Sequence, residues 1–398
     1  MRVGIFTDGY EPHTSGVTTS IKMLKSALEG MKHEVYIVAV NLESYKFVYD
    51  EENKIIRIPG VKTGIYNTRL TSIYSRKAMK IIKSWNLDVI HSQTEFGVGT
   101  FSRIVAKRLK LPVVHTYHTL YEDYVYYVTH GHFDKLGKKV AIQMTKYFCE
   151  KNCDELVVPT DKIKDLFLDK YGIKREINVI PTGIDTQKFE DTPEMEKKID
   201  SIKKKYKIGK EDFIVGSVGR IAQEKSFDVQ IKAMKPLVDK DPSFKMFIVG
   251  DGPELGNLKK LVKSLDMEKN VFFTGLVPYS EVPIYLNLFD VMTSFSRTET
   301  QGLTIIEGLS ASTPVVCIDD ESFREMVQDK YNGYLFKNDA EFRNDVMRLK
   351  NNKDLYDEMV INAKNSIHKY SKEVFAADIL KVYSKAIMKN KIKYSKED

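Results

Sequence analysis

Two cations in the second half of the chain have the type and spacing of a phosphate site. Arg220 and Lys225 lie in the segment Gly219–Lys225, directly after the apolar run Phe213–Val218. A guanidinium binds phosphate oxygens through parallel N–H groups, and a lysine adds a second positive charge. The two side chains therefore suit a diphosphate. A surface turn with solvated charges is the alternative interpretation of this segment.

Two carboxylates follow further along the chain. Glu299 and Glu307 flank the turn that contains Gly302. This glycine stands where a strand should turn into a helix, which would leave backbone N–H groups open to a ligand. Carboxylates at such a place accept hydrogen bonds from sugar or ribose hydroxyls. A helix with two spaced glutamates is common, so these carboxylates alone do not indicate a ligand site. They do so only in combination with the preceding cations. Together the segments suggest that the chain holds a nucleotide-sugar and moves its sugar.

Short apolar runs must form the strands that position these residues. They alternate with helical stretches, which is typical of βα units around mostly parallel sheets. In the N-terminal half we predict strands at Val3–Thr7, Val35–Val40, Ile55–Ile58, Val89–His91, Val113–His115, Leu156–Val158 and Asn178–Ile180. In the C-terminal half we predict Phe213–Val218, Lys245–Val249, Val271–Phe273, Val291–Ser294 and Pro314–Ile318. Ligands of open α/β sheets bind at the carboxyl ends of such strands.

The length of the chain favours two domains. At 398 residues it exceeds one ordinary domain, and 42% hydrophobic residues are enough for two cores. We predict an α/β chain with two Rossmann-like domains, residues 1–190 and 191–371, that face each other across a cleft. We expect the basic helix at residues 372–398 to pack back on the first domain.

The composition excludes several classes of protein. The first six residues already have a strand pattern, so we expect no secretory signal, and no apolar run approaches the roughly 20 residues of a membrane helix. Cys149, Cys153 and Cys317 are interpreted as buried thiols rather than a disulfide framework. The one Asp-x-Asp triplet, Asp239-Lys240-Asp241, lies in a polar stretch before a proline, so we expect no metal site there.

The net charge of +7 belongs mainly to the N-terminal half. Residues 1–190 contain 28 Lys and Arg against 22 Asp and Glu, whereas the remaining residues contain 34 against 33. A positive field of this kind indicates an anionic partner for the first half.

A window without acids lies between Glu52 and Asp88. If this window is helical, four of its cations share an arc of about 60°: Arg69, Arg76, Lys80 and Lys83. The only tryptophan, Trp85, lies on the opposite, apolar side. A basic amphipathic helix suits an anionic membrane surface. The alternative is a crossover helix with its apolar side on the sheet, and both can hold at once. Five later tyrosines suit an interfacial entrance for a lipid: Tyr117, Tyr121, Tyr124, Tyr126 and Tyr127.

The motifs together resemble the retaining glycosyltransferases of family four, which have the GT-B fold. The resemblance covers nearly the whole chain and is carried by Ser15-Gly16-Val17, Pro181–Asp185, Gly219–Lys225, Val249–Glu254 and Glu299–Glu307. Three further runs resemble the bacterial members that glucosylate diacylglycerol: His91–Phe96, Tyr117–Tyr124 and Thr298–Thr304. Many members have an aromatic residue where this chain has Gln301, and the lipid-modifying subgroup shares the glutamine.

The resemblance implies a role for each matching residue around the donor. Arg220 and Lys225 would bind the diphosphate. Glu299 and the backbone amides of Gln301, Gly302, Leu303 and Thr304 would hold the transferred sugar and phosphate. Glu307 would hold the ribose, and the backbone of Leu276 and Val277 would meet the base.

The resemblance also implies roles in the first domain, which would bind the acceptor and the membrane. Gly16 would let its loop close on the diphosphate and the acceptor. His118 would lie at the transferred sugar, either at its 6-hydroxyl or beside the developing positive charge. We expect catalysis to rest on His118, Glu299, Arg220 and Lys225, without a tightly bound cofactor and without a divalent metal for donor binding.

The implied activity is transfer of glucose from UDP-glucose to the 3-hydroxyl of 1,2-diacylglycerol, with retention, by a peripheral protein on the cytoplasmic face of the cell membrane. One alternative is a member of the same family that uses another sugar donor, or a phospholipid or soluble acceptor. A more remote alternative is a non-catalytic module that binds anionic surfaces or nucleic acid, and the charge is its only support.

Overall fold

The computed structural model describes residues 1–13, 15–62, 69–122 and 134–395. The chain divides into two compact units. Unit 1 consists of Met1–Gly183 together with Lys372–Asp398, and unit 2 consists of Ile184–Ser371. The first division therefore falls at Gly183, whereas the sequence pattern put it at residue 190.

The described strands of unit 1 form one mainly parallel sheet in the order β3-β4-β2-β1-β6-β7-β8-β9, with β5 paired to β4. Their bounds are β1 Arg2–Thr7, β2 Glu34–Asn41, β3 Val48–Asp50, β4 Ile55–Lys62, β5 Arg69–Thr71, β6 Val89–Ser92, β7 Val113–Thr116, β8 Glu155–Val158 and β9 Asn178–Val179. Only β3 and β5 among them run antiparallel to their partner, β4.

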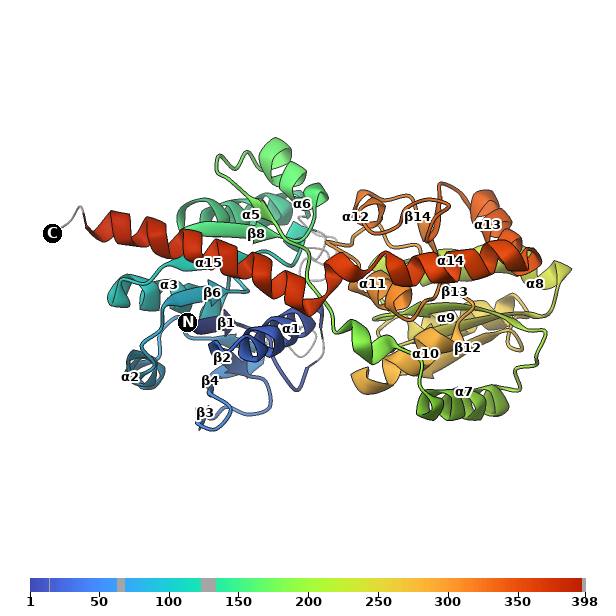
Figure 1. Cartoon of the computed structure of the whole chain (residues 1–398), viewed down its shortest axis with the longest axis horizontal. Helices are drawn as coiled ribbons and strands as arrows, with labels where there is room; N and C mark the ends of the chain where they lie inside the picture. The colour runs from blue at the N-terminus through green and yellow to red at the C-terminus, as the bar shows by residue number, and fades with distance from the viewer. Residues whose placement is uncertain (14, 63–68, 123–133, 396–398) are drawn as a thin grey trace. The chain divides into compact units, whose positions relative to one another are not determined.

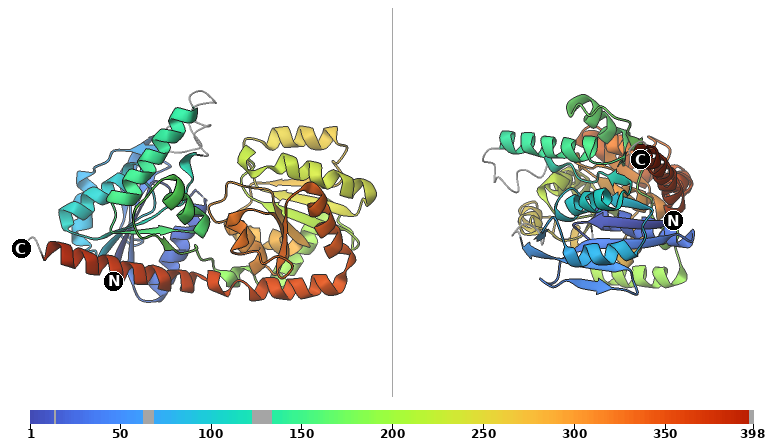
Figure 2. Two further views of the ribbon diagram at one scale, coloured as in Figure 1. Left: turned by 90° about the horizontal axis from the view of Figure 1, so that it is seen from above. Right: turned by 90° about the vertical axis from the view of Figure 1, so that its left-hand side faces the viewer.

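Helices cover both faces of this sheet (Figures 1 and 2). They are α1 Gly16–Gly30, α2 Arg76–Ser84, α3 Gly97–Leu109, α5 Asp134–Lys146, α6 Asp161–Asp165 and α15 Lys372–Tyr394, with a π-helical turn, η1, at Tyr147–Lys151. One apolar core joins α1 and α15 to the sheet, and another joins α2 and α3 to its other face. Alternate side chains of each strand supply the two cores, as expected for a sheet covered on both faces.

The last helix, α15, is an integral part of unit 1. Ile379 and Tyr383 are buried in the core shared with α1, and the Tyr383 hydroxyl lies 2.7 Å from Nδ1 of His91 on β6. Lys389 forms a 2.5 Å ion pair with the buried carboxylate of Glu155 on β8. Residues from both ends of the sequence therefore build one core, and α15 lies beside α1 in the ribbon view (Figure 1).

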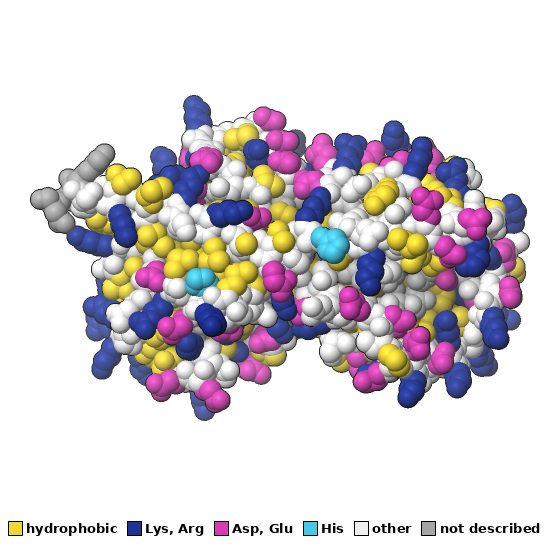
Figure 3. Space-filling view, viewed as in Figure 1, with side chains coloured by type: hydrophobic (Ala, Val, Ile, Leu, Met, Phe, Trp, Pro, Cys, Tyr) yellow, Lys and Arg dark blue, Asp and Glu magenta, His cyan; other side chains and the backbone are white. Residues whose placement is uncertain are grey.

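Unit 2 contains a second, fully parallel sheet in the order β12-β11-β10-β13-β14-β15. Its strands are β10 Phe213–Val218, β11 Phe244–Val249, β12 Val271–Gly275, β13 Val291–Ser294, β14 Val315–Ile318 and β15 Gly333–Phe336. Its helices are α7 Pro193–Tyr206, α8 Phe227–Lys240, α9 Leu255–Ser264, α10 Val282–Leu288, α11 Leu303–Ser310, α12 Glu321–Arg324, α13 Asp339–Asn351 and α14 Lys353–Asn365. On the face in Figure 3, unit 2 shows lysines, arginines and acids intermixed.

The α/β prediction is confirmed, and each predicted strand is present with differences of one or two residues at its ends, except that β4 continues beyond the predicted Ile58 to Lys62. The short strands β3, β5 and β15 were not predicted. Each of them pairs with a single neighbour, and all three have only three or four residues. Runs of this length carry too little alternation to stand out in a sequence.

The predicted basic helix is shorter than expected, and two of its residues lie elsewhere. Helix α2 begins at Arg76, so Arg69 lies on strand β5, where its side chain is buried and donates to the carbonyl oxygen of Gly60 at 3.1 Å. Trp85 is also buried and stacks on Tyr36, with ring centroids 4.8 Å apart. A large aromatic ring gains more from such burial than from exposure to water. Arg69 and Trp85 therefore do not belong to an exposed surface.

No helix in the described part of the chain combines the length and the apolar content that crossing a membrane requires. Cys149 and Cys317 are buried free thiols, and Cys153 is partly buried.

Candidate active site

The turn that carries Arg220 is fixed by close backbone packing. It follows β10, and the neighbouring turn after β11 lies directly against it: the N–H of Ile221 donates to the carbonyl oxygen of Asp251 at 2.9 Å. A Cβ on Gly250 would lie 2.0 Å from the carbonyl oxygen of Gly219, and Gly250 has a φ of +144°. Only glycine fits this approach. The two strand ends therefore hold Arg220 at the carboxyl edge of the sheet.

Both predicted cations are ion-paired. Arg220 pairs with Glu224 four residues later, and Lys225 pairs with Glu299 at 2.5 Å. All four side chains are at least half-buried. The second pair confirms that the two sequence segments meet in space, because the cation follows β10 and the carboxylate follows the adjacent strand β13.

Gly302 shapes the start of helix α11. It is the N-cap residue, with a φ of +81°, and a Cβ there would lie 2.7 Å from the ring of Phe323. The same position is 3.9 Å from Cγ of Glu299, so this glutamate passes beside the helix N-terminus. Leu303 and Thr304 are the first residues of the helix and are partly exposed, whereas Gln301 is buried. Their amides and the helix dipole favour an anion.

Glu307 lies one turn further along α11 and is buried. The Tyr279 hydroxyl donates a 2.7 Å hydrogen bond to its Oε1. Burial raises the pKa of Glu307 to about 7, against a smaller lowering by this hydrogen bond. Near neutral pH the carboxyl is therefore present in both its protonated and its ionised form.

Leu276 and Val277 follow Gly275, the last residue of β12, and Leu276 is strongly exposed.

In unit 1, His118 lies beyond the end of β7. Its Nε2 is 2.6 Å from Oε1 of Gln93, which follows the adjacent strand β6. Burial lowers the pKa of His118 to about 4. The imidazole is therefore neutral at pH 7, and its Nε2 lies within hydrogen-bonding distance of the glutamine side chain.

A second polar group accompanies this pair at the same strand ends. The Glu95 carboxylate accepts a hydrogen bond from Tyr121 and lies 3.0 Å from Nε2 of His115.

Gly16 is the first residue of α1, which follows β1. Ser15 caps that helix by accepting a 3.2 Å hydrogen bond from the N–H of Thr18. Gly16 thus lies at the carboxyl edge of the unit 1 sheet. Of the predicted tyrosines, Tyr124, Tyr126 and Tyr127 lie outside the described residues.

The Asp-x-Asp triplet is engaged in ion pairs. Asp239 lies in the last turn of α8 and pairs with Lys235, and Asp241 pairs with Lys350 at 2.5 Å. Among the described residues, no group of three or more His, Cys, Asp or Glu side chains is placed to hold a metal ion.

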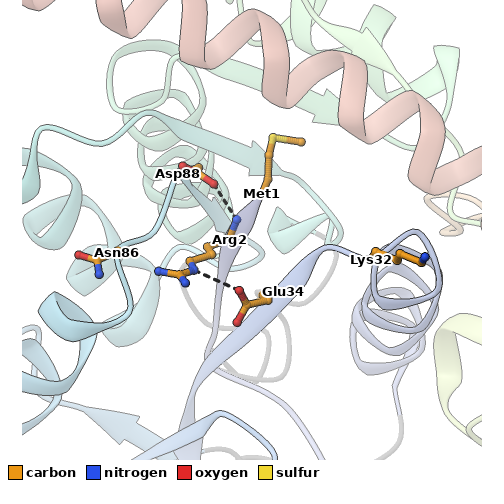
Figure 4. A pocket seen from close by; sticks show the side chains of 6 residues that line it. All are labelled: Met1, Arg2, Lys32, Glu34, Asn86 and Asp88. Atoms are coloured by element: carbon orange, nitrogen blue, oxygen red, sulfur yellow. Dashed lines mark hydrogen bonds and ion pairs between the residues drawn. The ribbon is translucent and has the colours of Figure 1, made fainter.

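A polar hollow in unit 1 lies at the other end of the sheet (Figure 4). Arg2, Glu34 and Asp88 stand at the amino ends of β1, β2 and β6, away from the carboxyl edge. Arg2 is paired with Glu34 at 3.1 Å, and its backbone N–H donates to Asp88 at 2.7 Å. The charges of Arg2 and Glu34 satisfy one another, and the hollow lies away from the carboxyl edge, so we do not assign it to the site.

Sequence reasoning missed the partners of the predicted residues. Gln93 and Tyr279 were given no role, and Glu224 was read only as part of its motif. Gln93 could have been found, because it follows a strand that pairs with the strand before His118. Tyr279 gave no such signal, because its contact depends on how a short 3₁₀ turn, Tyr279–Glu281, packs on α11.

Comparisons with known proteins agree with this architecture. The model of "Glycosyltransferase Family 4" matches residues 14–188, and that of "Glycosyl transferases group 1" matches residues 198–366. A UDP-glucose complex of Alr3699/HepE from Anabaena superposes with a TM-score of 0.73 at 17% identity, covering 96% of this chain and 99% of that one. The fold is therefore GT-B, as predicted.

Two curated relatives extend over the whole chain. The α-monoglucosyldiacylglycerol synthase of Acholeplasma laidlawii is 33% identical, and the match covers all of both chains. The enzyme of the same name from Streptococcus pneumoniae is also 33% identical, over 98% of this chain and 87% of the relative. The chain belongs to glycosyltransferase family four, the family that its motifs resemble.

Proposed function

We propose that this glycosyltransferase moves glucose from UDP-glucose to the 3-hydroxyl of 1,2-diacylglycerol, with retention of the α-configuration, at an anionic membrane surface. The observation that carries the proposal is the end-to-end match to two α-monoglucosyldiacylglycerol synthases. Both units contribute to that match, so it includes the half that would bind the acceptor as well as the half that would bind the donor. The UDP-glucose bound to a GT-B protein of similar fold supports the choice of donor.

The proposed donor site lies at the carboxyl edge of the unit 2 sheet. Breaking the glycosyl–phosphate bond builds negative charge on the leaving diphosphate. Arg220, Lys225 and the N-terminus of α11 would stabilise that charge. Glu224 and Glu299 already hold the two cations in place. A preorganised pair loses less side-chain freedom when the donor binds. No divalent metal is needed in this scheme.

The remaining donor contacts are assigned by the motif. Glu307 would accept hydrogen bonds from ribose hydroxyls, and Glu299 would do so from the transferred glucose. Leu276 and Val277 would present backbone groups to the base. In unit 1, neutral His118 would contact the glucose, and Gly16 would permit close approach to the diphosphate. No residue is assigned as a covalent nucleophile, so the leaving phosphate oxygen would take the acceptor proton as the new bond forms on the same face.

The proposed membrane surface centres on α2. Lys77, Lys80 and Lys83 are exposed, and so is Arg76, whereas Ala78, Met79 and Ile82 face the core. Trp85 and Arg69, being buried, are no longer part of it. Exposed apolar side chains lie instead in β4, in β5 and in the turn before the helix, on Val61, Leu70 and Ile73. Val61 and Leu70 are cross-strand partners in β4 and β5. At roughly 1 kcal/mol per cation, the lysines would give salt-sensitive recruitment to the cytoplasmic leaflet.

One experiment separates the candidate functions. Labelled UDP-glucose is incubated with vesicles that contain diacylglycerol and an anionic phospholipid. Label in the lipid extract supports the proposal. Transfer only with other sugar donors, or only to phospholipid or soluble acceptors, supports the family-level alternative. Vesicle binding without transfer from any donor supports the non-catalytic module.

A further inference from the structure

Helix α5 carries apolar side chains on two opposite sides. Ala141 and Thr145 are buried against unit 1, and Phe148 continues this inner side in η1. On the outer side, Leu136, Val140 and Tyr147 are 61%, 61% and 59% exposed. A helix that covers a sheet needs one apolar side only. The second one has no role in the fold of the described residues.

The outer apolar residues form a stripe with cations beside it. At about 100° per residue, Leu136, Val140 and Tyr147 fall within an arc of about 40°. Three lysines occupy the adjoining arc on one side: Lys135, Lys139 and Lys146. From Lys135 to Lys146 the helix contains no acidic residue. An apolar stripe next to a basic one is the pattern of a helix that lies in a bilayer interface.

The surroundings favour a bilayer over a protein partner. Helix α3 lies next to this segment, since Arg103 of α3 contacts the ring of Phe148 at 4.7 Å. Helices α2 and α3 contain no Asp or Glu, and their exposed cations include Lys80 and Lys107. Figure 2 shows α5 on the side of the sheet away from α15. Glu150 of η1 lies on this side as well, but the lysines outnumber it. A predominantly basic face complements many lipid phosphates better than it complements one acidic patch.

We propose that the outer stripe of α5 binds an anionic bilayer as a second contact, separate from α2. Leu136 and Val140 enter the boundary between headgroups and acyl chains. The Tyr147 ring lies at headgroup level, where an aromatic ring with a polar tip is favoured. Lys135, Lys139 and Lys146 meet lipid phosphates. This inference rests on the membrane-surface part of the proposed function. It extends that surface to α5, a helix that follows His118 in the chain.

A tryptophan reporter tests this contact directly in the full-length protein. Val140→Trp is compared with Ile361→Trp, whose position is equally exposed at 61% but lies on α14 of unit 2. The buried Trp85 gives a background that is subtracted with the parent protein. Vesicles contain equal parts of phosphatidylglycerol and brominated phosphatidylcholine. We expect a blue shift and bromine quenching for Val140→Trp, and neither for Ile361→Trp.

The outcomes separate this inference from the proposed function. If the protein sediments with the vesicles while V140W is quenched no more than I361W, α5 does not enter the bilayer and the inference is wrong, although recruitment stands. If the protein stays in the supernatant, both the α5 contact and the proposed recruitment to an anionic membrane are wrong. A blue shift without lipid that grows with protein concentration identifies a contact between copies, which also overturns the inference.

A loss-of-binding variant gives a second readout. Leu136→Ser combined with Val140→Ser should weaken vesicle binding about tenfold, since each lost apolar contact weakens partitioning severalfold. UDP binding and the unfolding temperature should stay unchanged, because both side chains are exposed. Ile361→Ser is the matched control and should leave vesicle binding as it was. Unchanged binding of the double variant would contradict the proposal.

Discussion

The Tyr279 hydroxyl donates a 2.7 Å hydrogen bond to the buried carboxyl of Glu307. Burial has raised the pKa of this carboxyl from 4.5 to about 7. Between these values the folded protein retains a proton that the unfolded chain has lost. The contribution of Glu307 to stability is therefore largest below pH 4.5, and it declines as the pH rises to 7.

Donor binding should be coupled to the ionisation of Glu307. If ribose hydroxyls donate to this carboxylate, binding favours its ionised form. The affinity for UDP should then increase about tenfold between pH 6 and pH 8, as the ionised fraction rises around a pKa near 7. Titration calorimetry measures this dependence. Glu307→Gln provides the control, because it keeps an acceptor for Tyr279 and loses the charge. An equal pH dependence in this variant, arising from UDP itself, would remove Glu307 from the ribose site.

Lys225 should contribute more to lowering the activation barrier of sugar transfer than to the stability of the fold. Lys225→Ala removes one of the two cations at the proposed diphosphate site. We expect the barrier to rise by about 2–4 kcal/mol, on the scale of a lost oxyanion donor, so kcat/KM should fall about thirtyfold to a thousandfold. Arg220→Ala should behave similarly. Lys232→Ala is the control, since this exposed lysine of α8 forms an ion pair with Asp228, one helical turn earlier, far along the chain from the proposed site residues of β13 and α11. Wild-type turnover in K225A would contradict the donor-site assignment.

Gly302 should tolerate no side chain. Gly302→Ala combines a φ of +81° with a Cβ that meets the Phe323 ring at 2.7 Å. We expect a loss of at least about 1 kcal/mol in the free energy of unfolding, together with weaker donor binding, because the N-terminus of α11 must shift. Gly256→Ala, in α9, has no atom within 4 Å of its new Cβ and no positive φ. It should be neutral or stabilising by about 0.5 kcal/mol. Urea unfolding of the two variants gives the comparison.

Recruitment by α2 should depend on its exposed lysines and on salt. The triple change Lys77→Gln, Lys80→Gln and Lys83→Gln should weaken binding to anionic vesicles by about tenfold or more, since each cation near such a surface contributes roughly 1 kcal/mol. The matched variant replaces the exposed Lys259, Lys260 and Lys263 of α9. Equal losses of vesicle binding in both triple variants would show that recruitment depends on net charge alone and not on the position of α2. Arg69→Gln should instead lower the unfolding temperature, because Arg69 is buried.

The strands were predictable from local pattern alone. Runs such as Phe213–Val218 are apolar, β-branched and bounded by turns, and they end where a ligand site of an α/β sheet lies. Arg220 and Glu299 were therefore placed on the correct edge. Their partners within the site were harder to predict, because Lys225 meets Glu299 only through the pairing of β10 with β13.

The errors came from extending one pattern too far. The arc that joined Arg69 to Lys83 assumed a continuous helix, but a β-strand occupies its first residues. In that strand the guanidinium of Arg69 donates hydrogen bonds to backbone carbonyl oxygens and is not available to lipid. Trp85 follows the end of α2 and completes the core around Tyr36. Periodicity identified the exposed lysines correctly, whereas the burial of these two residues depends on tertiary contacts.

The return of α15 to unit 1 has a consequence for biosynthesis. The core around Ile379 and Tyr383 also contains Val3 and Ile5, so residues made before unit 2 must wait for residues made after it. Unit 2 is continuous from Ile184 to Ser371 and has all its strands before α15 is translated. Domains usually fold in the order of their synthesis. Here the second unit can reach its native state first, and the first unit remains exposed to chaperones and proteases until α15 has been made.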